Sequence, residues 1–258
     1  AEYAYTNNDI CDFVNGSWSP ANPMSNIWTS SYKAIQICNQ YLAEFQGLTF
    51  DELKLNDDYR AQMFRYTNSF KEARFLRAYF YFNLVRAYGD VPYFTEMVTT
   101  DQVNSLTRTP AQEIFNAIIA ECDKLSTELP ADYTKLGLDG IAPAENGRVT
   151  CYAALALKAR AALYAASPLF NPENNKDLWR RAAEANKEVI ETCTANGFKL
   201  SKYSELWGPN NWSNNEMIFV RRYNGNISTL EEYNFPMGVP GGNSGNCPTQ
   251  NMVDAYEM

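Results

Sequence analysis

The chain has 258 residues, of which 45% are hydrophobic and 14% aromatic, and its formal net charge at pH 7 is −8. This aromatic content argues against a disordered chain, and the length allows a sizeable core in one large domain or two small ones. The acidic charge disfavours nucleic-acid phosphates as partners, and the absence of histidine excludes a Ser-His-Asp triad and the common zinc sites.

The amino-terminal segment, residues 1–25, is rich in Asn, Gly, Ser and Pro and predicts irregular structure. Apolar residues at helical spacing then predict a helix over 25–44 and a long second helix over 57–88. The second segment carries apolar residues on two opposite sides, which is typical of a helix packed between neighbours. Gly89 and Pro92 are expected to end it.

A third helix has a marked start in the sequence. Thr109 is its candidate N-cap, Pro110 its first helical residue, and Gln112 the second partner of a capping box. Pro130 is expected to end this helix, and the Gly-, Pro- and Asp-rich composition of residues 132–147 predicts a loop after it.

The fourth predicted helix, 149–166, contains eight alanines and only two charged residues, so it is apolar nearly all round. Such a helix is expected at the centre of a helical scaffold, where small side chains let its neighbours approach closely. A fifth helix is predicted over 177–195, and Gly197 is expected to cap its carboxy-terminal end.

The chain changes character after the fifth helix. We predict a short strand over 217–223, a loop rich in Asn, Gly, Ser and Pro over 224–250, and the start of another helix at 251–258. Antiparallel helix pairs with Ala and aromatic interfaces resemble degenerate tetratricopeptide-type stacking. The fold class is therefore predicted to be mainly α, with a tetratricopeptide-like helix-pair scaffold, an irregular loop-rich region and a short strand.

None of the six cysteines lies within four residues of another, so no CxxC-type metal or redox motif is present. Four of them fall inside predicted helices, where a buried free thiol is favoured and a disulfide stays open: Cys38, Cys122, Cys151 and Cys193. No Asp-x-Asp-x-Asp-Gly loop is present to bind calcium. We therefore expect no metal site and no cofactor.

Residues 70–94 read FKEARFLRAYFYFNLVRAYGDVPYF, and this run resembles the signature helix of the SusD/RagB family, including its Gly-Asp-Val-Pro exit. Further segments resemble that family in the same order along the chain: 28–42, the Arg-Thr-Pro helix at 108–130, the Gly-Arg-Val-Thr helix at 147–171, the Asn-Glu-Met-Ile-Phe segment at 215–219, and 248–258. These resemblances extend over nearly the whole chain.

The resemblance implies a SusD-like α-α superhelix in a single domain over 1–258, with the helical scaffold at 25–196 and a ligand-facing, loop-rich region at 197–258. We expect the chain to be a fragment, without the family's lipid-anchor cysteine. On the scale of a typical domain, about a tenth of the family's length is absent at the start and roughly two fifths at the end.

The resemblance also implies a function. Members of the family are non-enzymatic lipoproteins of the outer membrane and cell surface, which bind oligosaccharide or polysaccharide and deliver it to a SusC-like TonB-dependent transporter for nutrient uptake. A peptide ligand, as in RagB-like uptake proteins, stays as the alternative. A protein-binding helical repeat and a glycoside hydrolase are two other classes, and the latter needs two carboxylates about 5–10 Å apart across a cleft.

A sugar presents a flat apolar face edged by hydroxyls, so a glycan site needs exposed aromatic rings beside polar side chains. Two turn-rich segments, 15–28 and 207–246, combine these residue types. The candidate ligand-binding residues in them are Asn15, Trp18, Asn22, Asn211, Trp212, Tyr233, Asn234 and Phe235. For each of them, a structural role in covering the scaffold stays open. Four arginines are expected to pair with carboxylates or helix ends rather than with ligand: Arg74, Arg77, Arg148 and Arg160.

Overall fold

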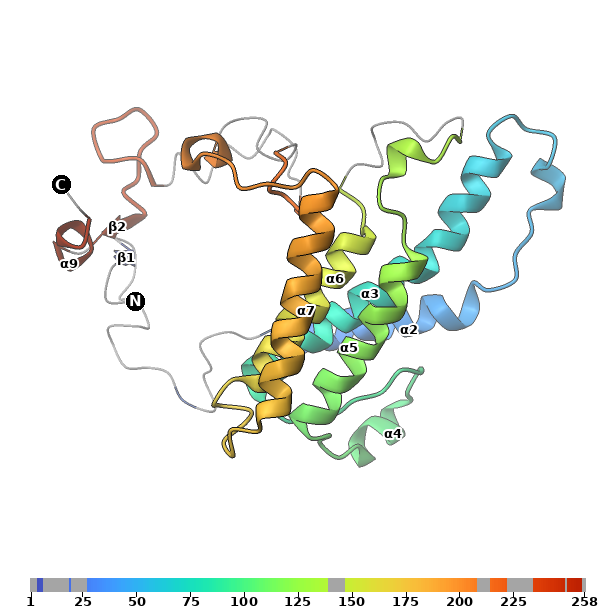
Figure 1. Cartoon of the computed structure of the whole chain (residues 1–258), viewed down its shortest axis with the longest axis horizontal. Coiled ribbons are helices and arrows are strands. Elements are labelled where there is room, and N and C mark those ends of the chain that lie inside the picture. The colour runs from blue at the N-terminus through green and yellow to red at the C-terminus, as the bar shows by residue number, and fades with distance from the viewer. Residues whose placement is uncertain are drawn as a thin grey trace. The chain divides into compact units, whose positions relative to one another are not determined.

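The structure is a computed structural model, and it describes residues 4–6, 19, 27–138, 147–207, 214–221, 234–248 and 250–256. The chain divides into two compact units, one formed by residues 27–221 and the other by residues 1–26 together with 222–258. The first unit is helical, whereas the second contains two short strands and a short helix (Figure 1).

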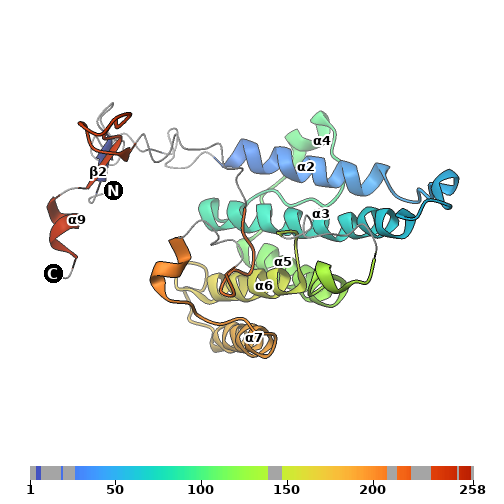
Figure 2. The same cartoon turned by 90° about the horizontal axis from the view of Figure 1, so that it is seen from above.

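Five long helices build the described part of the unit 27–221: α2 (Trp28–Glu44), α3 (Tyr59–Tyr88), α5 (Ala111–Glu128), α6 (Cys151–Ala166) and α7 (Lys176–Ala195). Each of them packs against the next in the chain, so they follow one another as layers in Figure 2. All five were predicted from sequence, and their bounds differ from the predicted ones by three residues or fewer. The predicted helix-pair scaffold is thereby confirmed.

Neighbouring helices run antiparallel, because contacts join the start of one to the end of the next. Trp28 at the start of α2 packs edge-on against Tyr88 at the end of α3, with ring centroids 5.2 Å apart. Gln112 at the start of α5 donates a hydrogen bond of 2.7 Å from Nε2 to the backbone oxygen of Ala165, near the end of α6. This arrangement is tetratricopeptide-like, as the sequence predicted.

Helix α6 lies between α5 and α7 and also contacts α3. Ten of its 16 residues are buried, and Ala154, Ala161 and Ala166 have no exposed surface. Its alanines allow this close approach, as expected from the composition. The amino group of Lys158 ties the three helices together, because it lies 2.5 Å from Asp123 on α5 and 2.8 Å from Glu188 on α7.

The start of α5 corrects one sequence prediction. Pro110 occupies the N-cap position, and the side chain of Gln112 turns toward the end of α6 instead of completing a capping box with Thr109. The cap comes from another element: Asp90, just after α3, accepts a 2.8 Å hydrogen bond from the backbone N–H of Ala111. The helix N-terminus is therefore satisfied by a tertiary contact.

A short helix, α4 (Thr100–Ser105), was not predicted from the sequence. It begins with a capping box in which Thr99 Oγ1 accepts from Gln102 N and Gln102 Oε1 accepts from Thr99 N. With six residues, the helix is too short to show an apolar periodicity.

The strand predicted over 217–223 is a second correction. Residues 218 and 219 form a bend, residues 217, 220 and 221 have no regular secondary structure, and residues 222 and 223 lie outside the described part of the chain. Phe219 packs edge-on against Phe75 of α3, with ring centroids 5.5 Å apart. A strand needs a partner strand, and the sheet formed by the described residues pairs residues 4–6 with residues 246–248 and does not include this segment.

The second unit contains β1 (Ala4–Thr6) and β2 (Asn246–Pro248), which pair antiparallel with Tyr5 opposite Cys247. Helix α9 (Gln250–Asp254) follows and confirms that a helix begins near residue 251. Within the described ranges of the chain, no helix combines the length and the apolar character that crossing a membrane requires.

Candidate functional site

Most of the predicted ligand-binding residues lie outside the described residues: Asn15, Trp18, Asn22, Asn211, Trp212 and Tyr233. Their roles stay predictions. Asn234 and Phe235 are described, and both are exposed in the second compact unit. They lead directly into a closed loop formed by residues 235–244.

The loop 235–244 is held closed by hydrogen bonds between its own residues. Ser244 N donates to Phe235 O at 2.8 Å, which joins the two ends of the loop. Met237 N donates to the Ser244 hydroxyl, also at 2.8 Å, and two further turns are closed inside the loop. A Cβ at Gly242 would lie 2.3 Å from Pro236 O, so the backbone segments approach too closely for any other residue without a shift.

The same loop exposes apolar side chains. Phe235, Met237 and Val239 are 42%, 74% and 44% exposed, although the loop has a defined fold. Asn234 and Asn243 lie at its two ends and add amide groups. An exposed aromatic ring beside amides is the combination that a sugar face and its hydroxyls require.

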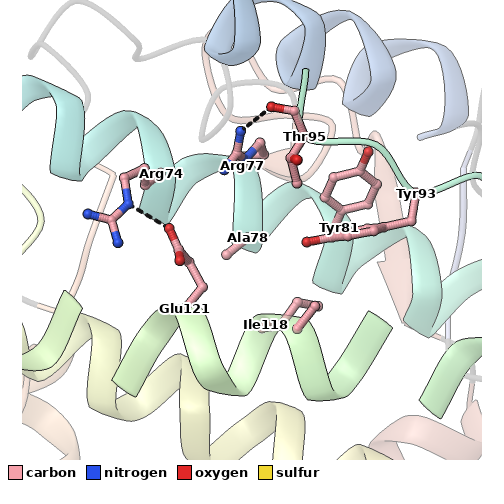
Figure 3. A pocket seen from close by; sticks show the side chains of 9 residues that line it. Arg74, Arg77, Ala78, Tyr81, Tyr93, Thr95, Ile118 and Glu121 are labelled. Carbon is pink, nitrogen blue, oxygen red and sulfur yellow. Dashed lines mark hydrogen bonds and ion pairs between the residues drawn. The ribbon is translucent and has the colours of Figure 1, made fainter. Parts of the chain in front are cut away.

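A second feature is a cavity of about 130 Å³ between α3, α5 and the segment that follows α3 (Figure 3). We name it the α3–α5 cavity. Its lining residues are Arg74, Arg77, Ala78 and Tyr81 from α3, Tyr93 and Thr95 from the following segment, and Ala117, Ile118 and Glu121 from α5.

Ion pairs fix the arginines of this cavity. Arg74 lies 2.7 Å from Glu121 through Nε and 2.6 Å from Glu128 through Nη1, and thus joins α3 to α5. Arg77 donates from Nη1 to Asn39 Oδ1 on α2 at 2.8 Å. The prediction that Arg74 pairs with carboxylates is therefore confirmed, whereas Arg77 is bound by an amide.

Tyrosines form the other wall. Tyr81 donates its hydroxyl to Phe94 O at 2.7 Å and accepts from Phe94 N at 2.9 Å, which holds the segment after α3 in place. Arg77 Nη1 also donates to Thr95 O at 2.8 Å. The rings of Tyr81 and Tyr93 lie 4.6 Å apart, and burial raises the pKa of both hydroxyls, so both are neutral at physiological pH.

The other two motif arginines lie elsewhere. Arg148 Nε is 2.9 Å from Glu72 Oε1 on α3, which confirms the predicted carboxylate pairing. Arg160 differs from the prediction, because its guanidinium lies 5.6 Å from the ring centroid of Phe82 and so interacts with an aromatic face.

The four helical cysteines are free thiols, as predicted, and three of them are buried. Burial raises the pKa of Cys122 to about 12, so this group is a thiol rather than a thiolate. Among the residues that the structure describes, no cluster of three or more His, Cys, Asp or Glu side chains is arranged to hold a metal ion.

The sequence prediction of the site did not include the α3–α5 cavity. Its α3 residues, Arg74, Arg77 and Tyr81, recur at helical spacing and so share one face, which was the available signal. Tyr93 and Thr95 follow the helix in an irregular segment, so no periodicity marks them.

A model of a SusD-like family, described as starch-binding and associating with the outer membrane, matches residues 3–163. The SusD-like protein P2 of Formosa agariphila is 26% identical over 210 residues, which are 80% of this chain and 35% of that protein. A SusD-like carbohydrate-binding protein from Bacteroides fragilis has a TM-score of 0.73 and 25% identity, with 100% of this chain and 45% of that chain covered. A SusD superfamily protein from Parabacteroides distasonis has a TM-score of 0.69 and 26% identity, covering 99% and 52%.

The chain thus spans about a third of the length of that curated relative and about half of each of the two solved structures. SusD-like proteins are carbohydrate-binding, non-catalytic proteins associated with the outer membrane. The family model covers more than half of the chain, and the solved structures share its helix-pair scaffold. The resemblance seen in the sequence is therefore confirmed: the chain belongs to the SusD-like family.

Proposed function

We propose that this chain is part of a nutrient-uptake protein that binds oligosaccharide or polysaccharide at the cell surface without cleaving it. The observation that carries the proposal is the match of residues 3–163 to a family described as starch-binding. The likeness of the whole chain to a SusD-like carbohydrate-binding protein supports it.

The proposed ligand-facing part is the loop-rich region 197–258, together with the turn-rich segment around Trp18. The loop 235–244 supports this assignment, because it holds Phe235 in solvent on a backbone closed by its own hydrogen bonds. A prefolded loop pays little conformational entropy when a ligand binds, which favours affinity.

Two finer elements belong to the same proposal. A lipid anchor holds the protein at the outer membrane, and a SusC-like TonB-dependent transporter receives the captured glycan. The association of the family with the outer membrane supports a location at that membrane.

Calorimetric titration of the chain with a glycan panel tests the proposal. The panel contains starch-derived oligosaccharides first, then plant, host and microbial glycans, with extended peptides in parallel. We expect saturable binding of at least one glycan and no release of shorter products. Phe235→Ala should weaken binding roughly tenfold, since truncation of a central aromatic contact costs more than about 1 kcal/mol.

Leu169→Ala is the matched control, because Leu169 is a 78% exposed apolar side chain of the helical unit. Its affinity should equal that of the unaltered chain. Binding of peptides alone would replace the glycan proposal with the RagB-like alternative, and cleavage of a glycan during the titration would contradict a purely binding role.

A further inference from the structure

We propose that the exposed guanidinium groups of Arg86 and Arg160 bind an oxyanion, a carboxylate or a sulfate ester, that is carried by a sugar. We name this pair the arginine clamp. The inference rests on the proposed glycan capture, and it deepens that proposal by naming a charged class of glycan. The two arginines belong to α3 and α6, which contact each other in the unit 27–221.

One buried ring brings the two arginines together. Phe82 is 1% exposed, and its ring centroid lies 5.8 Å from the guanidinium carbon of Arg86 and 5.6 Å from that of Arg160. Arg86 follows Phe82 by one turn of α3, whereas Arg160 reaches the same ring from α6. A guanidinium that packs on an aromatic ring keeps its N–H donors available, because they lie in its own plane. The ring therefore positions both side chains and leaves their donors for a ligand.

Neither arginine has a counter-ion in the described part of the chain. Both are exposed, and within the described residues neither donates a hydrogen bond or lies within 4.0 Å of a carboxylate oxygen. Carboxylates are abundant, since the chain has 30 Asp and Glu residues against 22 Lys and Arg, and Arg74 and Arg148 each pair with one. Two like charges beside one ring repel each other, and a bound anion offsets this repulsion.

The donors of the clamp select an oxyanion. A guanidinium group presents a planar fork of N–H donors, which matches two oxygens of one carboxylate or sulfate group. Such charge-assisted, bidentate hydrogen bonds are stronger than those between neutral groups. A neutral sugar would leave both positive charges uncompensated. The arginine clamp thus favours an acidic or sulfated sugar over a neutral one.

Side chains beside the clamp supply contacts for the rest of the sugar. Tyr164 lies one turn after Arg160, and its ring packs edge-on against Phe82 with centroids 5.2 Å apart. Among the described residues the Tyr164 hydroxyl has no hydrogen-bond partner. Leu163, three residues after Arg160, is 44% exposed. A hydroxyl and an aliphatic side chain next to the clamp match the hydroxyls and C–H groups of a sugar ring, which a free inorganic ion lacks.

NMR of the ¹⁵N-labelled chain tests the clamp through the Nε–H signals of its arginines, with glucuronate as the probe and glucose as the neutral comparison. We expect saturable shifts of the Arg86 and Arg160 signals with glucuronate and no saturation with glucose. Glucose 6-sulfate, titrated in parallel, shows whether the clamp prefers a carboxylate or a sulfate. Added salt should weaken the binding of either anion, because exposed charges are screened.

Arg86→Gln and Arg160→Gln each remove one fork and should weaken glucuronate binding roughly fivefold or more. Arg160→Lys keeps the charge without the fork and should also lose affinity. Arg180→Gln is the matched control, because it removes the same charge from an exposed arginine of α7 that pairs with Asp177. Its affinity for glucuronate should equal that of the unaltered chain, and thermal unfolding checks that every variant is folded.

Shifts that rise linearly with glucuronate, or equal affinities of Arg160→Gln and the unaltered chain, would overturn the proposal. Acetate that binds as tightly as glucuronate would show an adventitious ion only and overturn the assignment to a sugar. Phe235→Ala should leave the glucuronate shifts unchanged, because Phe235 belongs to the other compact unit. A neutral glycan that binds while the arginine signals stay still would contradict the clamp alone. Arginine shifts without any binding in the glycan panel would contradict the loop assignment alone.

Discussion

Arg148 and Glu72 join the segment before α6 to the middle of α3, with 2.9 Å between Nε and Oε1. Glu72 also accepts hydrogen bonds from Asn68 and from the hydroxyl of Tyr133, at 2.6 and 3.1 Å. The side chains of the pair are only 28% and 15% exposed, so water screens it less than a surface pair. Arg148 is the arginine of the Gly-Arg-Val-Thr motif, so this motif residue serves to hold the segment before α6 on α3.

Glu72→Gln should destabilise the helical unit by about 1–3 kcal/mol, because Arg148 then keeps a partly buried charge without its counter-ion. Thermal unfolding followed by circular dichroism should show a Tm lower by several degrees. Lys187→Gln is the control, because the Lys187–Glu191 pair has side chains that are 72% and 66% exposed and is worth less than about 1 kcal/mol. Equal losses in the two variants would contradict this reading.

Asp90→Ala should cost about 0.5–2 kcal/mol, the usual effect of removing an N-terminal cap. The reason is the hydrogen bond from Ala111 N to Asp90 Oδ1, which satisfies the start of α5. Thr109→Ala should change the free energy of unfolding by less than about 0.5 kcal/mol. Chemical denaturation of both variants measures the two changes in the free energy of unfolding. A larger loss of stability for Thr109→Ala than for Asp90→Ala would favour the capping box predicted from sequence.

The protein should lose stability as the pH rises above 10.0, the ordinary pKa of tyrosine. Burial raises the pKa of Tyr32, Tyr81 and Tyr133, so the folded protein holds these protons more tightly than the unfolded chain does. Their contribution to stability is complete below this pH and decreases above it. Tyrosinate absorbance and the circular dichroism of the helices should be followed together as the pH rises. Ionisation of these three tyrosines and loss of helical signal should occur in one cooperative step. Full ionisation of the tyrosines with intact helices would refute the prediction.

Cys122 should resist alkylation by iodoacetamide in the folded protein at neutral pH. It has no exposed surface, and burial raises the pKa of its thiol to about 12, so thiolate is scarce. Cys151 is half-buried and should be modified earlier. Mass spectrometry of the digested protein reads each site separately, and faster labelling of Cys122 than of Cys151 would show that α5 opens locally.

Gly242→Ala should open the loop 235–244, because the added Cβ would lie 2.3 Å from Pro236 O and 2.9 Å from Phe235 O. We expect faster thermolysin cleavage inside the loop and an unchanged Tm of the helical unit. Gly238→Ala is the comparison, since its Cβ would meet no atom within 4 Å and only its positive φ adds strain. Equal cleavage of all three proteins would show that the close approach does not hold the loop.

The long helices could be predicted from sequence because the information that defines them is local. Apolar spacing marked α3, the alanine-rich composition marked α6, and Gly89 and Gly197 marked two helix ends, where both glycines adopt positive φ. The free thiols followed from the position of the cysteines inside those helices.

The remaining features depend on partners that are distant in the sequence. Gln112 has the spacing of a capping residue, yet its amide satisfies carbonyls at the end of α6. The α3–α5 cavity brings Arg74 to Glu121, which lies 47 residues away, and no local pattern encodes such a meeting. Of the candidate glycan residues, only Asn234 and Phe235 lie in the described part of the chain, and their role stays a prediction.

The alanines of α6 also restrict how this protein can diverge. Ala154, Ala161 and Ala166 have no exposed surface, and neighbouring helices lie on both sides of α6. A larger side chain at any of these positions would therefore clash with a neighbouring helix instead of extending into solvent. Substitutions are accommodated on the narrow outer face, where Arg160 and Leu163 are exposed. Homologues as distant as about 25% identity should therefore keep small residues at those three positions while the outer face varies freely.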